Sequence, residues 1–172
     1  AKDLDVKIEF VPTDWKTLVN GVISGKYHMT GSASITAGRA KVAGYSESYF
    51  AVADVPLTLK ENSSRFANWD DLNKGDVKIV ATLGTAQEKR VKEYFPDAQY
   101  KIVEAPARDF QEVLAGRADA HITSNVEAST LTKKYPELMV VPVSATKSPT
   151  PIAMLLPQGD QVWINYVNTW IR

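Results

Sequence analysis

The strongest constraint on the fold is an alternation of short β-rich segments with amphipathic helices in the second half of the chain. Strands are predicted over residues 77–81, 100–103 and 119–123, and helices over 85–95, 106–115 and 124–134. Breaking residues mark the helix ends, such as Pro96 after the first helix and Gly116 after the second. Strands that alternate with helices form βαβ units with parallel strands, so the sequence predicts an α/β fold.

The rest of the chain carries weaker versions of this pattern. Residues 5–11 alternate apolar and polar side chains, which predicts a half-buried strand. Apolar residues at helical spacing predict a helix next, at Trp15, Leu18, Val19, Val22 and Ile23. Further segments are predicted as strands over 28–30, 139–143 and 152–156 and as helical turns over 160–172. Two β-rich stretches that contain proline, 51–60 and 148–155, are the predicted crossings between two lobes.

The composition excludes several classes of protein. The chain has 172 residues, of which 44% are hydrophobic, enough for one domain or two small lobes. Lysine plus arginine equals aspartate plus glutamate, at 20 each, which argues against a nucleic-acid or membrane-surface binder. There is no cysteine, and His28 and His121 have no second ligand at metal spacing, so we expect neither metal nor cofactor. No apolar run approaches the roughly 20 residues that span a bilayer.

The first candidate binding site is segment 31–39, where a predicted strand is followed by a predicted helix. Small hydroxyl residues, including Ser32 and Ser34, precede the helix, and Arg39 lies inside it. The free N–H groups at a helix start favour an anion, and a guanidinium can hold a carboxylate through two parallel hydrogen bonds. The sequence therefore predicts a carboxylate site here, with simple helix capping as the alternative.

Two further strand-to-helix junctions carry similar signals. Thr85 and Glu88 fit a capping box after Gly84, and Ser124 and Glu127 fit another. Capping explains both patterns, but three such junctions at one sheet edge also fit the position of ligands in α/β folds. Glu127 could hold an ammonium group or act as a general acid. Trp15 could flank a ligand, although its place in an apolar stripe favours the core.

These motifs resemble the extracellular solute-binding proteins of family 3, the polar amino-acid receptors of ABC importers. The resemblance rests on segments 29–50, 83–88 (Leu-Gly-Thr-Ala-Gln-Glu) and 116–120 (Gly-Arg-Ala-Asp-Ala). The resemblance implies that Ser34, Arg39 and the backbone N–H of Ala86 hold the α-carboxylate of a ligand. It also implies a periplasmic or extracellular monomer whose partners are a small carboxylate ligand and the membrane subunits of an importer.

The resemblance implies a type 2 periplasmic-binding-protein fold, in which two lobes joined by two β crossovers close on the ligand. Residues 1–55 and 150–172 would form lobe 1, and residues 56–149 would form lobe 2. On this interpretation the N-terminal strand and helix of the family are missing, and the C-terminal part is incomplete. The family's receptors usually have an aspartate for the ligand ammonium where this chain has Ser124.

Several residues also resemble a catalytic offshoot of the family, the cyclohexadienyl (prephenate/arogenate) dehydratases. The carrying residues lie in segments 11–15, 88–89, 125–128 and 136–138. In those enzymes the glutamate that matches Glu127 is the general acid that helps to expel the ring hydroxyl. Their Asn-Pro-Gly-Gly-Thr loop is replaced by Ala81-Thr82-Leu83-Gly84-Thr85 in this chain, and Ala81 cannot hydrogen-bond a substrate through its side chain. We therefore favour a binding protein, with the dehydratase as the alternative and a sensor module as a third possibility.

Overall fold

A computed structural model describes all 172 residues and shows a mixed α/β fold. The strands are β1 Ala33–Ser34, β2 Gly44–Tyr45, β3 Phe50–Leu59, β4 Lys78–Thr82, β5 Gln99–Val103, β6 Ala120–Ser124, β7 Leu138–Val140, β8 Lys147–Ala153 and β9 Leu155–Leu156. The helices are α1 Leu18–Ile23, α2 Ala37–Ala40, α3 Ala86–Tyr94, α4 Asp109–Leu114, α5 Asn125–Lys134 and α6 Gln161–Ile171. Single 3₁₀ turns cover Lys2–Leu4, Lys60–Asn62 and Asp70–Leu72.

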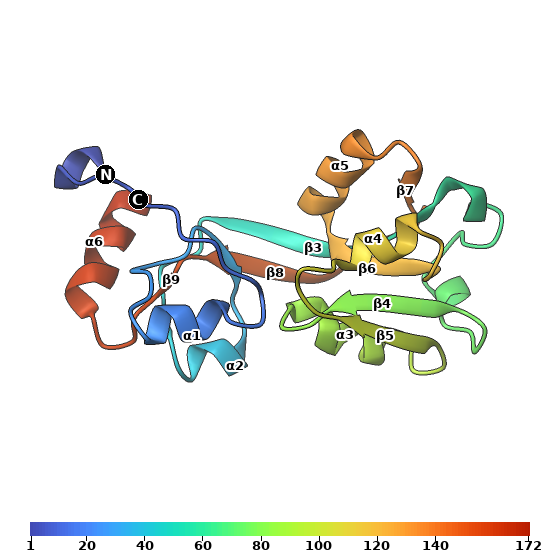
Figure 1. Ribbon diagram of the computed structural model, residues 1–172, viewed down its shortest axis with the longest axis horizontal. Coiled ribbons are helices and arrows are strands. Elements are labelled where there is room, and N and C mark those ends of the chain that lie inside the picture. Colours follow the sequence, from blue (N-terminus) through green and yellow to red (C-terminus); the bar gives the residue numbers. More distant parts are fainter.

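Two lobes are joined by two long strands, as Figure 1 shows. Strands β3 and β8 pair antiparallel and run from one lobe to the other, in the two stretches predicted as crossings. Helices α1, α2 and α6 lie in one lobe, and helices α3, α4 and α5 lie in the other (Figure 1). The predicted divisions at 55/56 and 149/150 fall inside β3 and β8. They remain a prediction of where each crossing strand passes between lobes.

The main sheet has seven strands in the order β1-β8-β3-β6-β4-β5, with β7 also paired to β3. Strand β4 pairs in parallel with both β5 and β6, which confirms the predicted βαβ arrangement. The crossing strand β3 pairs antiparallel with β6, so the sheet as a whole is mixed. The carboxyl ends of β4, β5 and β6 consequently meet at one edge, next to the other lobe.

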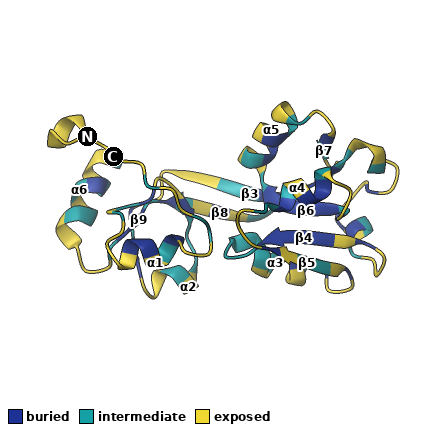
Figure 2. Cartoon of the chain, viewed as in Figure 1, coloured by how far each residue is buried: buried dark blue, intermediate teal, exposed yellow.

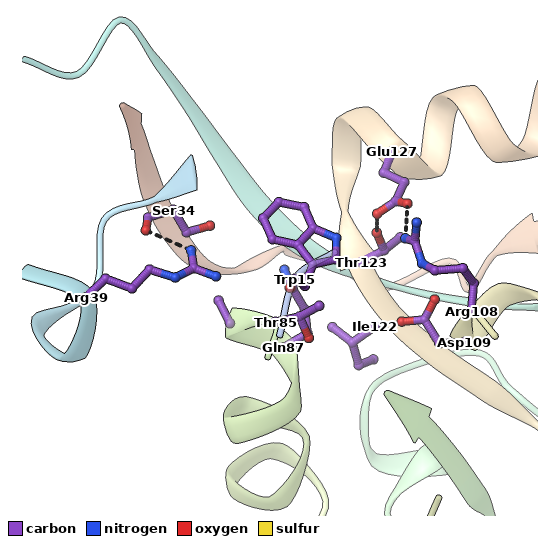
Figure 3. Close-up of a pocket in the computed structure, with 11 residues that line it drawn as sticks. Trp15, Ser34, Arg39, Thr85, Gln87, Arg108, Asp109, Ile122, Thr123 and Glu127 are labelled. Atoms are coloured by element: carbon purple, nitrogen blue, oxygen red, sulfur yellow. Dashed lines mark hydrogen bonds and ion pairs between the residues drawn. The ribbon is translucent and has the colours of Figure 1, made fainter. Parts of the chain in front are cut away.

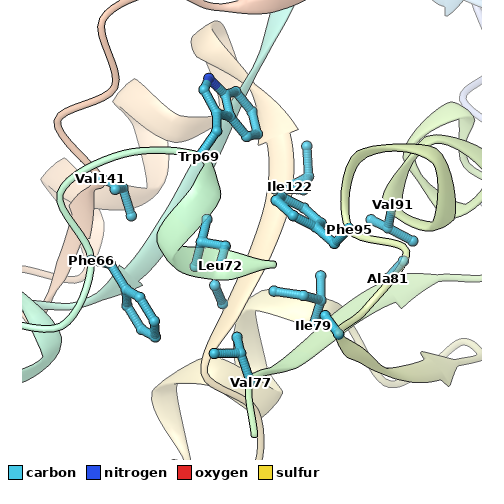
Figure 4. Packing of buried hydrophobic residues seen from close by; sticks show 12 residues of the cluster. Phe66, Trp69, Leu72, Val77, Ile79, Ala81, Val91, Phe95, Ile122 and Val141 are labelled. Atoms are coloured by element: carbon cyan, nitrogen blue, oxygen red, sulfur yellow. The ribbon is translucent and has the colours of Figure 1, made fainter. Parts of the chain in front are cut away.

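Helices cover both faces of this sheet, and Figure 2 shows that β4 and β6 are buried along most of their length. One cluster of 12 buried residues includes Ile79, Ile122 and Phe95, and Figure 4 shows it with the 3₁₀ segment around Leu72 packed against it. A second cluster of nine buried residues contains Val80 of β4 together with residues of α4 and α5. Burial from both faces explains why the three central residues of β4, Ile79, Val80 and Ala81, are all apolar.

Two predicted strands are not formed. Residues 5–11 make only two backbone hydrogen bonds, from Asp5 N–H to the Lys2 carbonyl and from Val6 N–H to the Ala1 carbonyl, and no strand lies beside them. Residues 28–30 are also irregular, because Thr30 is tied to Leu155 through its side chain as well as its backbone. An alternating pattern makes a strand only where a neighbouring strand accepts and donates its ladder bonds.

Other element boundaries differ from the prediction by a few residues. The first helix begins at Leu18, because the Asp14 carboxylate accepts a hydrogen bond from Thr17 N–H at 2.8 Å and holds the preceding residues in a turn. The segment 152–156 is divided at Met154, whose N–H donates to the Ser46 hydroxyl instead of a ladder partner. The helix predicted from residue 106 begins at Asp109.

Candidate functional site

A pocket lies between the two lobes (Figure 3). It is lined by Trp15, Ser34, Arg39, Thr85, Ala86, Gln87, Arg108, Asp109, Ile122, Thr123 and Glu127. The first three residues belong to the lobe of α1 and α2, and the others follow the carboxyl ends of β4, β5 and β6 or lie on β6. The space between these side chains, including the open mouth of the pocket, is about 370 Å³.

Arg39 is held at the junction of the lobes. Thr36 caps α2 by accepting a hydrogen bond from Arg39 N–H at 3.3 Å, which fixes the backbone of the arginine. The guanidinium donates to the Ser34 carbonyl at 3.2 Å and, across the lobes, to the Gly84 carbonyl at 3.1 Å. It also lies 5.7 Å from the centre of the Trp15 ring. No carboxylate of the chain pairs with it, so its charge is available to an anion.

Helix α3 points its first residues into the pocket. The Thr85 hydroxyl accepts from Glu88 N–H at 3.2 Å, as the capping prediction requires. The Glu88 carboxylate accepts from Gly84 N–H at 2.7 Å, one residue before the N-cap, so the reciprocal half of the box is shifted. The first N–H groups of a helix have no partner within it, and those of α3 belong to the pocket residues Ala86 and Gln87. They supply an anion site facing Arg39.

The second predicted capping box is only half formed. The Ser124 hydroxyl caps α5 by accepting from Glu127 N–H at 3.1 Å. The Glu127 carboxylate does not return the bond. It accepts instead from Arg108 at 3.0 Å and from the Thr123 hydroxyl, so it faces the pocket.

The structure brings together six of the eight predicted site residues. Trp15, Ser34, Arg39, Thr85, Ala86 and Glu127 line one pocket. Ser32 is exposed and Ser124 is engaged in capping, and neither lines it. Trp15 was considered both as a ligand contact and as a core residue. In the structure it lines the pocket and also packs against the apolar cluster around Leu18.

Sequence reasoning missed Arg108 and Asp109, which follow β5. The segment between β5 and α4 is a third junction between a parallel strand and a helix in the same lobe. Its residues were as good candidates for the ligand site as those after β4 and β6. Gln87, Ile122 and Thr123 were missed as well, because no local pattern separates them from ordinary strand and helix residues.

The backbone of Gly84 lies close to the backbone of the other lobe. Its φ is +83°, and a Cβ placed on it would lie 2.6 Å from the Trp15 carbonyl oxygen and 2.7 Å from the Lys16 Cα. Nearby, the ion pair between Lys16 and Glu104 also crosses between the lobes. Because backbone atoms cannot move aside as a flexible side chain can, only glycine allows this closure.

We therefore expect Gly84→Ala to weaken ligand binding at least tenfold, since about 1.4 kcal/mol of hindered closure has that effect. Isothermal titration with the best ligand measures it. Gly116→Ala is the matched control, because Gly116 also has a positive φ, +69°, but a Cβ there meets nothing within 4 Å. Both variants share the backbone cost of about 1 kcal/mol, and only the first blocks closure. Equal affinities in the two would contradict the role of this contact.

Comparison with known proteins gives the family. The family model of the bacterial extracellular solute-binding proteins, family 3, matches residues 1–172, the whole chain. The chain belongs to this family. None of its helices combines the length and the apolar character that crossing a membrane requires.

The relatives of this chain include both binding proteins and an enzyme. It is 26% identical over 173 residues to a cyclohexadienyl dehydratase from Pseudomonas aeruginosa, covering all of this chain but only 64% of the enzyme. It is 35% identical to an ancestral amino acid-binding protein, a precursor of cyclohexadienyl dehydratase, with a TM-score of 0.88, covering 99% of this chain and 73% of that one. A protein from Wolinella succinogenes, assigned as a binding component of an ABC transporter and crystallised with lysine, is 25% identical with a TM-score of 0.89 and coverages of 99% and 74%.

Proposed function

We propose that this family 3 protein captures an amino acid or a similar small carboxylate between its lobes and delivers it to the membrane subunits of an ABC importer. The observation that carries the proposal is Arg39, which has no carboxylate partner and lies in a pocket that both lobes line. We infer a periplasmic or extracellular monomer from the family and from the relatives that are amino-acid binding proteins.

The carboxylate would lie between Arg39 and the start of α3. Arg39 donates to two carbonyl oxygens in the structure, and a carboxylate offers it a charged acceptor of better geometry. The Ser34 hydroxyl forms no hydrogen bond within the chain, and the N–H of Ala86 lies in the first turn of α3. These groups would complete the anion site, with the Trp15 ring beside it.

Closure follows from the same contacts. Arg39 comes from one lobe, and Gly84 and Ala86 come from the other, so a bound carboxylate adds attraction between the lobes. A ligand that contacts both lobes favours the closed arrangement by its difference in affinity for the two states. Membrane subunits would recognise this closed arrangement of the lobes.

The alternative function is a cyclohexadienyl dehydratase with Glu127 as general acid. It is favoured by the alignment of the whole chain with the Pseudomonas aeruginosa enzyme and by the position of Glu127 in the pocket. A general acid must come within hydrogen-bond reach of the substrate, whereas both carboxylate oxygens of Glu127 already accept hydrogen bonds, from Arg108 and from Thr123. Ala81 lies in the core cluster under α3 and does not line the pocket. We therefore place binding before catalysis.

One experiment tests the two functions together. The purified protein is mixed with prephenate and with arogenate near neutral pH, and phenylpyruvate and phenylalanine are followed over time. In parallel, the common amino acids and these two compounds are screened for thermal stabilisation. We expect stabilisation by at least one carboxylate and no turnover. Product that disappears in Glu127→Gln would instead establish the dehydratase, and the absence of any stabilising carboxylate would overturn the binding proposal.

A further inference from the structure

Asp109 is a buried acid in the pocket that helix formation only half explains. It is 6% exposed and is the first residue of α4. Its Oδ1 accepts a hydrogen bond from Phe110 N–H at 2.8 Å and lies 3.5 Å from His121 Nδ1. Its Oδ2 has no hydrogen-bond partner in the chain, and the residue lines the pocket. One carboxylate oxygen is therefore left for something that enters the pocket.

The carboxylate keeps its charge in this position. Burial by itself raises the pKa of Asp109, but the nearby His121 ring, the Phe110 N–H and the Arg108 guanidinium outweigh it and lower the pKa below its usual value. A charge that is taken out of water is costly unless partners compensate it. The partners within the chain all lie at Oδ1, so Oδ2 can still accept a hydrogen bond.

The two ends of the pocket are opposite in charge. At one end Arg39 has no carboxylate partner. At the other end two carboxylates, Glu127 and Asp109, share one guanidinium, that of Arg108, and the ion pair is formed with Glu127. Figure 3 shows Arg39 and Asp109 apart, on either side of Thr85 and Trp15.

We propose that Asp109 binds a cationic group at the end of the ligand far from its carboxylate, so that the ligand is a small acid with a distal amine or guanidinium. This inference rests on the proposed function, because it takes the carboxylate to lie at Arg39. It differs from an α-ammonium site, since an α-ammonium lies beside the carboxylate and Asp109 lies away from Arg39 (Figure 3). Ile122 and the Trp15 ring would pack on the apolar carbons between the two charges.

Four acids of one chain length test the proposal. Lysine carries both amines, norleucine only the α-amine, 6-aminohexanoate only the distal amine, and hexanoate neither. Isothermal titration gives the affinity of each for the purified protein. We expect the distal amine to raise affinity about 10- to 100-fold in both pairs, as a charge-assisted hydrogen bond does. Lysine should therefore exceed norleucine, and 6-aminohexanoate should exceed hexanoate.

Substitution then assigns the effect to one side chain. Asp109→Asn keeps an acceptor for Phe110 N–H but removes the charge, so it should abolish the advantage of the distal amine and leave norleucine binding unchanged. Asp160→Asn is the matched control, because Asp160 also accepts a backbone N–H at a helix start, from Trp163 at 3.0 Å, but lies outside the pocket. It should leave all four affinities unchanged.

The outcomes separate this inference from the proposed function. If norleucine and hexanoate bind as tightly as their amine-bearing partners, Asp109 has no such role, although the carboxylate site stands. An amine advantage that persists in Asp109→Asn also overturns the assignment. If none of the four acids binds, the inference is wrong, and the wider screen described above decides the proposed function by itself.

Discussion

Replacing Arg39 by alanine is expected to weaken ligand binding more than any other single change in the pocket. Truncation of one partner of a buried, hydrogen-bonded charge pair costs about 2–5 kcal/mol. That corresponds to a loss of affinity from roughly 30-fold to several thousand-fold. The same substitution removes the hydrogen bond to the Gly84 carbonyl, so closure loses a contact in the empty protein as well.

Isothermal titration with the best carboxylate ligand measures this loss. Arg39→Lys should give an intermediate affinity, because lysine keeps the charge but loses the planar pair of donors. Arg172→Ala is the control, since Arg172 pairs with Glu47 at the surface and lies outside the pocket. Full affinity in Arg39→Ala would rule out a carboxylate held by this arginine, whatever the other variants show.

Removal of the Asp54 carboxylate is expected to cause the largest loss of stability. Asp54 lies on the crossing strand β3, is fully buried, and accepts hydrogen bonds from Gln87 at 2.9 Å, Arg90 at 3.0 Å and Tyr94 at 2.8 Å. All three donors come from α3. Burial above all, with Asp54 adding to it, raises the pKa of Tyr94 to about 12, so the phenol remains a donor at neutral pH.

The same group of residues reaches the other crossing strand. Arg90 also donates to the Thr150 hydroxyl at 2.7 Å, and the Tyr94 hydroxyl contacts that of Ser148. Helix α3 is thus attached to β3 and to β8 at the place where the lobes are joined. We expect this attachment to hold the first turn of α3 in position for the ligand.

Asp54→Ala should lower the free energy of unfolding by about 3–5 kcal/mol, because it leaves Arg90 buried without its partner. Urea denaturation measures the change. Asp54→Ala combined with Arg90→Met should cost less than the single substitution, since no unpaired charge remains. Asp97→Ala, which removes an exposed carboxylate bonded to Asn73, should change stability by less than about 1 kcal/mol. A single substitution no worse than this control would contradict the assigned role of Asp54.

Part of the fold and of the site could be predicted because the signals are local. The apolar run at 77–81, the caps Thr85 and Ser124, and the breaks at Pro96 and Gly116 act within a few residues of themselves. They define the βαβ order, and the order places the carboxyl ends of the parallel strands at one edge. The junctions that contain Ser34, Thr85 and Glu127 could therefore be recognised as candidates from the amino-acid sequence, and the resemblance to family 3 placed Ser34, Arg39 and Ala86 at one carboxylate.

The predictions that failed depended on neighbours distant in sequence. Residues 5–11 have the alternation of a strand but no strand beside them. Glu127 has the spacing of a capping box, yet its carboxylate prefers Arg108, 19 residues away. Asp109 looks like any acid in a first helical turn until His121 and the pocket are seen around it.

The α/β class, the order of most elements and the candidate junctions could be predicted from the amino acids alone, because periodicity and capping are short-range effects. Which charges remain unpaired depends on the folded chain. That depends on the closure of the lobes, which brings Arg39 to Gly84, and on the sheet register, which brings Asp109 to His121. The strength of an electrostatic interaction depends on the distance between the charges and on their burial, and neither can be derived from the order of residues along the chain.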